Sequence, residues 1–364
     1  MLTGSKKKQF ESLEIHYHRL KGIGKAGEII KGFSKENPIL VYFDPDIDGL
    51  ISGYFVCKFL VSKGYRFTWY INRNREHGFK IPVEKLKGIG GIIAVDFLMS
   101  YRELVSVVRG GVSIVSMDHH VKEDGGYFRD GSCEGVIINN QYEFEEEDGR
   151  YLSGAGVVFE CLREFDRGFD TKENRALVGL TLLSDVRDIE NANARGYLMD
   201  LYSHKCKGYI GYLISNTIGD VDYGFGVPRM DRNFVDFTFS PVINSCLRFG
   251  LEKEVVNFIL GSGKIDREYR IEQREFVEHL LEVSEKVDYG SLYYVRIDGS
   301  DLTDFEYSVA TNFVGLVASR CLDGSHSCIC SIVGLEGRIL RASFRGHING
   351  LGYLSALNAT GKLI

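Results

Sequence analysis

The clearest indication of the fold is the stretch in which the run Ile39-Leu40-Val41-Tyr42-Phe43 is followed at once by Asp44-Pro45-Asp46-Ile47-Asp48-Gly49. Its first half is a continuous apolar run, which is typical of a strand buried on both faces of a parallel sheet. Ile92 to Val95 and Val112 to Val115 are runs of the same kind. Its second half places three carboxylates in a loop that closes at a glycine. The stretch therefore predicts a buried parallel strand that ends in an acidic loop.

Three further polar clusters follow apolar runs in the same way: Asp96, Asp118-His119-His120 and Asp185. Open α/β sheets bind their ligands at the carboxyl ends of the strands, so we expect all the clusters to meet at one edge of the sheet. Carboxylates and imidazoles bind divalent ions. Two such ions about 3.5 to 4 Å apart supply the charge neutralisation, nucleophilic hydroxide and leaving-group stabilisation that phosphodiester hydrolysis needs. The clusters predict a two-metal phosphoesterase site.

Each cluster contributes to the predicted site in a different way. Asp46 and Asp48 are two residues apart, so each can serve one ion, and Asp96 is the expected bridging carboxylate. The imidazole of His119 favours Mn²⁺, with Mg²⁺ as the alternative. The predicted metal ligands are Asp44, Asp46, Asp48, Asp96, His119 and Asp185. The candidate catalytic residues are Asp96, His119, His120 and Asp185, with His120 facing the phosphate if it is not a ligand.

Taken singly, the clusters have simpler explanations. The Asp-Pro-Asp-x-Asp-Gly run is turn chemistry and also fits a helix N-cap. A calcium-binding loop would need a glutamate at its twelfth position and further oxygen ligands, whereas Leu50 to Phe55 is apolar. Asp96 and Asp185 each fit a helix cap. Four such clusters at successive strand or helix ends favour the metal site.

The composition predicts a cytoplasmic protein with a substantial core. The 364 residues suggest two to three domains, and 44% of them are hydrophobic. No apolar run approaches the roughly 18 residues of a membrane span, and no apolar segment follows the lysines of Met1 to Phe10, so we expect no membrane association. Eight cysteines without a CxxC pair predict buried, reduced thiols. The formal net charge of −6 argues against a generally basic nucleic-acid-binding surface.

The order of the expected elements predicts three parts. Strands and helices alternate from Ile39 to about Leu183, which indicates an α/β fold with a doubly wound parallel sheet. Leu251 to Lys286 is charge-rich at helical spacing and predicts a long connector helix. Strand patterns at Leu292 to Ile297 and Ser327 to Val333, with a helix from Phe313 to Leu322 between them, predict a smaller α/β domain. The expected divisions are residues 1–250, 251–289 and 290–364.

These residues carry a family resemblance. Asp46-Ile47-Asp48-Gly49, Asp96, Asp118-His119-His120 and Leu183-Ser184-Asp185 resemble the successive motifs of the DHH phosphoesterase superfamily. Further segments resemble those of RecJ-type single-strand exonucleases: Leu152 to Val157, Pro241 to Asn244 with Arg248, and Asn312 to Arg320. The resemblance covers roughly Leu40 to Phe344. It implies a DHH catalytic domain, a DHHA1-like domain, Mn²⁺ or Mg²⁺ in the cleft between them, and contact of His120 with the scissile phosphate.

The resemblance also suggests substrate contacts. Four arginines would line the second domain's side of the cleft and bind backbone phosphates: Arg248, Arg320, Arg341 and Arg345. Ser153 and Gly154 begin a small-residue segment that fits a phosphate loop at a helix N-terminus or, equally, a structural turn. Arg73 and Arg75 beside His77 fit either phosphate contacts or solvated surface residues. Tyr142 and Phe144 fit either base stacking or local packing.

One expected motif is missing. The family's C-terminal domain carries a glycine-rich GGH motif, which should begin where this chain stops, at Ile364. We expect either a C-terminally truncated substrate-binding domain or a displaced equivalent at Gly346-His347. Such a change would reduce affinity for long strands.

Two reaction classes remain open at this point. The segments outside the metal motifs favour 5′ to 3′ exonuclease activity on single-stranded DNA, with a role in DNA repair or recombination. The excess of acidic over basic residues favours hydrolysis of a short substrate, such as nanoRNA, 3′-phosphoadenosine 5′-phosphate or a cyclic dinucleotide. A binding or scaffold protein would have lost metal ligands, which are all present here. The expected partner is therefore single-stranded nucleic acid or a short oligonucleotide, and the sequence identifies no protein partner.

Overall fold

The computed structural model describes residues 20–72, 79, 81–82, 86–121, 126–141, 150–185, 191–203, 208–218, 232–323, 325–334 and 337–346. These residues divide into two compact units. The first comprises the described chain up to Leu247 together with Glu252–Asp266, and the second comprises Arg248–Leu251 and the described chain from Arg267 onward. No helix in the described ranges combines the length and hydrophobicity needed to cross a bilayer.

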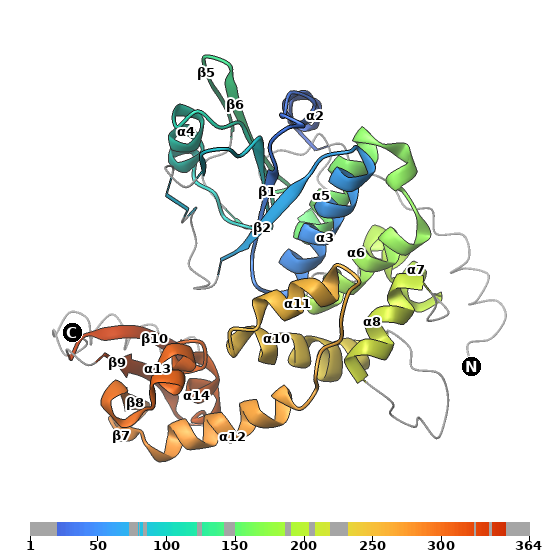
Figure 1. Ribbon diagram of the computed structural model, residues 1–364. Helices are drawn as coiled ribbons and strands as arrows, with labels where there is room; N and C mark the ends of the chain where they lie inside the picture. Colours follow the sequence, from blue (N-terminus) through green and yellow to red (C-terminus); the bar gives the residue numbers. More distant parts are fainter. Residues whose placement is uncertain are drawn as a thin grey trace. The chain divides into compact units, whose positions relative to one another are not determined.

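The first unit is built on a six-stranded sheet in the order β2-β1-β3-β4-β6-β5 (Figure 1). Five strands run parallel, and the edge strand β5 is antiparallel to β6. This confirms the predicted doubly wound parallel sheet. Every residue of β1, β3 and β4 is buried, which explains their continuous apolar sequences. The strands are β1 (Ile39–Phe43), β2 (Phe67–Ile71), β3 (Gly91–Val95), β4 (Ile114–Asp118), β5 (Gly126–Asp130) and β6 (Cys133–Asn139).

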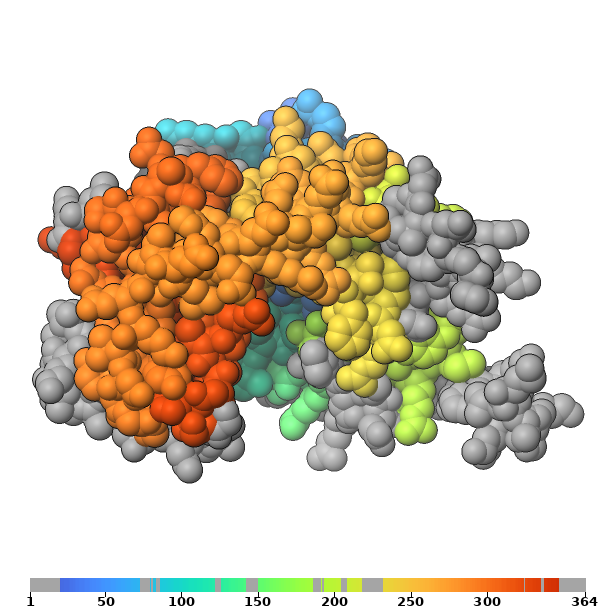
Figure 2. Space-filling model, turned by 90° about the horizontal axis from the view of Figure 1, so that it is seen from below, coloured from blue at the N-terminus to red at the C-terminus, as the bar shows by residue number. Residues whose placement is uncertain are grey.

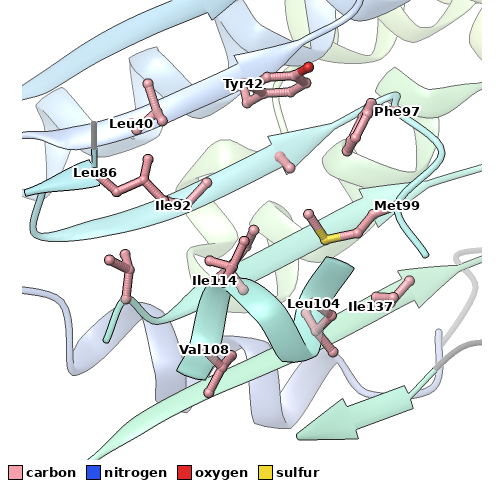
Figure 3. Packing of buried hydrophobic residues seen from close by; sticks show 13 residues of the cluster. Leu40, Tyr42, Leu86, Ile92, Phe97, Met99, Leu104, Val108, Ile114 and Ile137 are labelled. Carbon is pink, nitrogen blue, oxygen red and sulfur yellow. The ribbon is translucent and has the colours of Figure 1, made fainter. Parts of the chain in front are cut away.

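Helices cover both faces of this sheet (Figure 1). On one face, α4 (Tyr101–Arg109) buries Leu104 and Val108 against Ile92 and Ile114, as Figure 3 shows. On the other face lie α3 (Ile47–Ser62) and α5 (Gly154–Phe165), which pack against each other. α3 approaches β1 so closely that an ideal Cβ on its Gly53 would lie 2.8 Å from the Phe43 ring. This close approach fixes the acidic loop that joins β1 to α3.

Further helices complete the first part of the chain. They are α2 (Ile23–Lys31), η3 (Arg167–Phe169), α6 (Lys172–Ser184), α7 (Ala192–Ser203), α8 (Gly208–Ile218), α9 (Arg232–Phe234), the π-helical turn η4 (Val235–Phe239), α10 (Ser240–Arg248) and α11 (Glu252–Ile259). α6 packs against α5 and α7 and ends next to Asp185. It thereby brings Asp185 to the functional site described below.

The second unit has a four-stranded sheet in the order β10-β9-β8-β7. β8 and β9 are parallel, and the outer pairs are antiparallel. Its core joins Leu280, Val295, Phe313 and Ile332. α12 buries only two of its residues, and Figure 2 shows this helix, in orange, at the surface. The elements are α12 (Tyr269–Glu282), β7 (Glu285–Asp288), β8 (Leu292–Asp298), η5 (Gly299–Asp301), α13 (Asp304–Ala310), α14 (Val314–Arg320), β9 (Ser327–Val333) and β10 (Ile339–Arg345).

Some elements differ from the sequence predictions. Residues 251–289 form two helices and the edge strand β7, and not one long helix, because Gly261 and Gly263 adopt positive φ angles of 89° and 129° between α11 and α12. α11 lies in the first unit and α12 in the second. The predicted strand that contains Val112 to Val115 begins two residues later, at Ile114, and ends at Asp118 as predicted. β5 and α13 were not predicted.

Candidate metal centre

The polar clusters meet at the carboxyl-terminal edge of the first sheet. The strand registers place Phe43 of β1 beside Val95 of β3, and Asp118 of β4 beside Asn139 of β6. The residues at the ends of these strands therefore share one edge, where an open α/β sheet binds its ligand. This arrangement is the one that the sequence predicts.

Two groups of side chains could each hold a metal ion. The first group consists of Asp96, Asp118, His119 and His120, and the second of Asp48, His119 and Asp185. Within each group, the potential ligand atoms all lie within 4.8 Å of one another. The two groups share His119, so the candidate sites adjoin.

His119 lies at the centre of these contacts. Its Nε2 atom is 3.0 Å from Asp96 Oδ1 and 3.6 Å from Asp48 Oδ2. Its Nδ1 atom is 3.7 Å from Asp185 Oδ2. The imidazole is therefore bordered by carboxylates that come from three different segments of the chain.

The backbone of Asp96 has an unusual conformation. Asp96 is the only non-glycine residue with a positive φ angle in the described part of the chain, at 51°. This region of φ is uncommon for residues with a side chain, although aspartate tolerates it better than most. The turn directs the chain away from β3 while the side chain stays buried, with 2% of the residue exposed. Such local strain is characteristic of functional sites.

The N-terminus of α5 holds Asp48 in place. The backbone N–H groups of Gly154 and Ala155 donate to the two carboxylate oxygens of Asp48 at 2.6 and 2.9 Å. Ser153 accepts a hydrogen bond from Gly156 N–H, and its hydroxyl bonds that of Thr181 at 2.8 Å. The positive end of the helix dipole thus faces a protein carboxylate. These contacts give Ser153 and Gly154 a role in positioning Asp48, and their contact with substrate stays a prediction.

Burial and mutual repulsion affect the buried carboxylates. Burial raises the pKa of Asp48 to about 6, and the charge of Asp185 adds to this rise while that of His119 opposes it. Burial also raises the pKa of Asp96 well above its ordinary value, with a further contribution from the negative charges of Asp48 and Asp46. Negative charge is therefore costly at this edge without a cation.

Asp118 and His120 form a tight pair next to this cluster. His120 Nδ1 lies 2.7 Å from Asp118 Oδ1. Burial lowers the pKa of His120, but the hydrogen bond and the charge of Asp118 outweigh it and raise the pKa to about 9. Burial raises the pKa of Asp118, but the contacts with His120 and His119 outweigh it and hold that pKa below its ordinary value. Asn139 Nδ2 donates to the backbone oxygen of His120 at 2.9 Å and so fixes the loop.

The donor set fits divalent cations. Asp96 Oδ1 and His119 Nδ1 are buried and form no hydrogen bond in the described part of the chain. Most buried polar atoms are hydrogen-bonded, so such atoms call for an additional partner. Carboxylate oxygens and imidazole nitrogens are suitable ligands for Mn²⁺ and Mg²⁺. The cluster is therefore able to hold metal.

Asp44 and Asp46 lie near the cluster but have other contacts. Asp46 is the N-cap of α3, and its side chain accepts a hydrogen bond from Gly49 N–H at 3.0 Å. Asp44 accepts one from Asn72 Nδ2 at 3.5 Å. Among the residues that the structure describes, neither belongs to the two candidate groups. Their metal ligation stays a prediction.

The predicted phosphate-binding arginines lie in the second unit. Arg248 donates to Gln273 Oε1 at 2.8 Å, and its backbone oxygen accepts from Asn312. Arg320 pairs with Glu278 at 3.0 Å in an exposed contact, which contributes little to stability. Arg345 is exposed and lies at the end of β10. Its side chain reaches Gly315: the Nη2 atom of Arg345 is 3.0 Å from the position of an ideal Cβ on Gly315. Contact of these arginines with substrate stays a prediction.

The sequence placed Asp118 in one of the predicted clusters without giving it a role, and it did not assign Asn72 or Asn139 to the site. Asp118 and Asn139 are the last residues of parallel strands, and Asn72 directly follows β2. A polar residue at this position was the available signal. Other predicted residues lie outside the described ranges: Arg73, Arg75, His77, Tyr142, Phe144 and residues 347–364.

Known proteins share this domain and this fold. Residues 38–184 match the family model described as "DHH family, N-terminal domain". None of the curated proteins matches the chain.

Three solved structures resemble the chain over most of its length. RecJ in complex with Mn²⁺ from Thermus thermophilus has a TM-score of 0.65 at 18% identity, over 88% of this chain and 47% of that chain. An exonuclease RecJ bound to manganese has a TM-score of 0.64 at 18% identity, over 86% of this chain and 80% of that chain. RecJ in complex with Mg²⁺ from Thermus thermophilus has a TM-score of 0.59 at 15% identity, over 94% and 52%. The chain thus spans about half the length of the Thermus proteins.

The family match covers β1 to α6, which carry or position every member of the two candidate metal groups. At this level of identity, the structural likeness shows the fold. Residues 38–184 match the DHH family's N-terminal domain, and the chain has a RecJ-like fold.

Proposed function

We propose that this chain is a metal-dependent phosphodiesterase that digests single-stranded DNA from the 5′ end towards the 3′ end. The observation that carries the proposal is the pair of adjoining groups that share His119, at the strand ends of a DHH domain. A structural role alone would not account for so many buried acids around one imidazole. Two divalent ions, Mn²⁺ or Mg²⁺, are the proposed cofactors.

The residues at the sheet edge have separate tasks in this proposal. Bound divalent ions supply Lewis-acid chemistry, which neutralises phosphate charge and favours deprotonation of the attacking water. Asp96, Asp48, Asp185 and His119 hold them. The pair with Asp118 orients the His120 ring through Nδ1. In this proposal, His120 contacts the scissile phosphate. Asn139 keeps this loop in position.

The choice of single-stranded DNA is supported by the RecJ-like fold. Two of the similar structures are of RecJ with Mn²⁺ or manganese, and one of these proteins is described as an exonuclease. Arg248, Arg320 and Arg345 are the proposed phosphate contacts of the second unit. Each backbone phosphate that an arginine neutralises adds to the salt dependence of binding.

The test incubates the purified chain with Mn²⁺ and single strands of about 30 nucleotides, which exceed the roughly 4 to 16 nucleotides of a typical single-strand site. One strand is labelled at its 5′ end and another at its 3′ end, and a labelled dinucleotide is run in parallel. We expect early release of labelled mononucleotide from the 5′-labelled strand and none in the presence of a chelator. Early release from the 3′-labelled strand would reverse the proposed polarity.

Two outcomes would overturn the assignment. Cleavage of the dinucleotide alone would make the chain a short-substrate phosphoesterase. Activity that survives in both Asp96→Ala and His119→Ala would remove the metal cluster from the reaction. Asp130→Ala is the matched control, because Asp130 is an exposed acid at the end of β5. It should retain full activity.

Arg345 tests the second unit separately. Arg345→Ala should weaken binding of the long strand. The slope of log affinity against log salt should fall by roughly the contribution of one phosphate contact, with a smaller effect on the rate at saturation. An unchanged salt slope would exclude Arg345 from the phosphate path.

A further inference from the structure

A buried threonine lies between the helix that holds Asp48 in place and the helix that ends at Asp185. Thr181 is near the C-terminal end of α6 and is fully buried. Every other residue from Ala176 to Leu183 is apolar or glycine, so its hydroxyl interrupts an otherwise apolar stretch. A buried hydroxyl is costly unless it forms hydrogen bonds. The contacts of this hydroxyl therefore indicate what the threonine does.

The direction of each hydrogen bond follows from the atoms involved. Thr181 Oγ1 lies 2.9 Å from the backbone oxygen of Val178, which can only accept, so the single hydroxyl hydrogen of Thr181 points there. The Ser153 hydroxyl is 2.8 Å from the same Oγ1 atom, so Ser153 donates its own hydrogen to Thr181. The Ser153 oxygen in turn accepts the Gly156 N–H at 3.3 Å. The two hydroxyls thus form a directed link from α5 to α6.

On one side, this link supports the N-terminus of α5. Ser153 is the N-cap of α5 and is fully buried. The next two backbone N–H groups, of Gly154 and Ala155, donate to the carboxylate of Asp48 at 2.6 and 2.9 Å. A displacement of Ser153 would therefore move both donors away from Asp48.

On the other side, the backbone of Thr181 supports the end of α6. Its carbonyl oxygen accepts the Asp185 N–H at 2.9 Å and the Ser184 hydroxyl at 3.2 Å. Asp185 is the C-cap of α6. Asp48, His119 and Asp185 make up one of the two candidate metal groups. A single residue thus connects the supports of two carboxylates in the same group.

We propose that Thr181 is a positioning residue that sets the distance between Asp48 and Asp185 and so determines how tightly their group binds a divalent ion. The proposal rests on the metal centre of the proposed function. It concerns metal affinity, which is measured without substrate. Residues that orient metal ligands commonly change metal affinity by about 10- to 100-fold.

A second buried threonine offers a matched control. Thr217 of α8 is buried, and its hydroxyl donates to the backbone oxygen of Leu213 on the preceding turn at 2.6 Å. It therefore has the same kind of bond within its helix as Thr181 has with Val178. Replacement of either threonine by valine keeps the shape of the side chain and removes one buried hydroxyl. At Thr181, the replacement also breaks the bond to α5.

The test measures the Mn²⁺ affinity of the full chain by titration calorimetry. Thr181→Val should weaken binding of at least one ion by about 10- to 100-fold, whereas Thr217→Val should bind as the wild type does. Thr181→Ser keeps the hydroxyl and should retain most of the wild-type affinity. Equal affinities of Thr181→Val and Thr217→Val would overturn the proposal, and so would a Thr181→Ser variant that binds as weakly as Thr181→Val.

The wild-type chain separates this proposal from the proposed function. A chain that binds Mn²⁺ with the expected dependence on Thr181 but cleaves no strand would disprove the nuclease function and support the positioning role. A wild-type chain that binds no Mn²⁺ would overturn both.

A second measurement decides the question even if Thr181→Val does not fold. Ser153→Ala breaks the same bond from the α5 side, and the amide hydrogen exchange of Asp185 reports the effect at the end of α6. In a chelator, this amide should exchange about fivefold faster than in the wild type. Thr171→Ala removes the cap at the other end of α6, controls for a general loss of stability, and should leave the rate nearly unchanged. Equal exchange rates of Asp185 in the two variants would overturn the proposal.

Discussion

At Gly154, the space for a side chain is occupied by the carboxylate of Asp96. An ideal Cβ there would lie 2.4 Å from Asp96 Oδ1. Gly154→Ala should therefore displace Asp96 and weaken Mn²⁺ binding by about 10- to 100-fold, the usual effect of disturbing residues that orient metal ligands. Titration calorimetry measures this change.

A control for Gly154 lies in α2. Nothing lies within 4 Å of an ideal Cβ on Gly24. Gly24→Ala should leave metal affinity unchanged and stabilise the helix by about 0.5 to 1 kcal/mol. Equal metal affinity in both variants would show that Asp96 adjusts freely.

Asp96 itself should destabilise the metal-free protein. Its carboxylate is buried, and its pKa is raised by burial and by neighbouring acids. Asn keeps the shape and tolerates the same backbone conformation. In a chelator, Asp96→Asn should raise the free energy of unfolding by roughly 1 kcal/mol, while Mn²⁺ should no longer raise its melting temperature. Asp130→Asn, at an exposed site, should behave like the wild type. A less stable Asp96→Asn variant would mean that the charge supports the metal-free fold.

The acidity of Cys321 predicts a pH profile. Its thiolate is the reactive form, so the rate of alkylation should rise with pH and pass its midpoint near pH 7, where the pKa lies. The interaction with Cys328 is the largest cause of this low pKa, and the charge of Lys286 also lowers it. Lys286→Met removes the cation and should move the midpoint to higher pH. An unchanged midpoint would exclude Lys286 as a cause.

Single residues of the site were predictable where an apolar run precedes them in the sequence. Asp96, His119 and Asp185 each follow an apolar run, and the structure brings them together around one imidazole. Asn139 was not predictable as a site residue, because its role depends on the pairing of β6 with β4. The role of Gly154 depends on tertiary packing between α5 and the loop after β3. The sequence identified the acids of the site and gave no indication of what holds them.

At the level of elements, burial on both faces made three strands the plainest to predict. β1, β3 and β4 are buried throughout, and their continuous apolar sequences are typical of buried strands. β5 and β7 are edge strands with mostly exposed residues, Gly126–Asp130 and Glu285–Asp288, so they lack a continuous apolar pattern. Their pairing is set by their neighbours in the sheet.

The N-terminus of α5 links local capping to the metal centre. Ser153→Ala removes the cap and the bond to Thr181, so it should cost about 1 kcal/mol of stability and should also lower metal affinity, because α5 holds Asp48. Thr171→Ala is the matched control, since Thr171 caps α6 through Asn174 N–H. It should cost similar stability without loss of metal affinity. Urea unfolding and metal titration of both variants separate the two effects.

On the scale of the whole molecule, all members of the two candidate metal groups belong to the first unit, while the second unit has a hydrophobic core of its own. Ligand binding stabilises only the part of the protein that unfolds together with the binding site. The free energy of unfolding of that part rises by about 2.7 kcal/mol at a free metal concentration of 100 times Kd. Mn²⁺ should therefore slow amide hydrogen exchange in β3, β4 and α5 by up to about 100-fold and leave β8 and β9 nearly unchanged. Asp96→Asn should remove the effect in the first unit. Equal protection in β8 and β9 would instead show that the units unfold together or that the second unit contributes to metal binding.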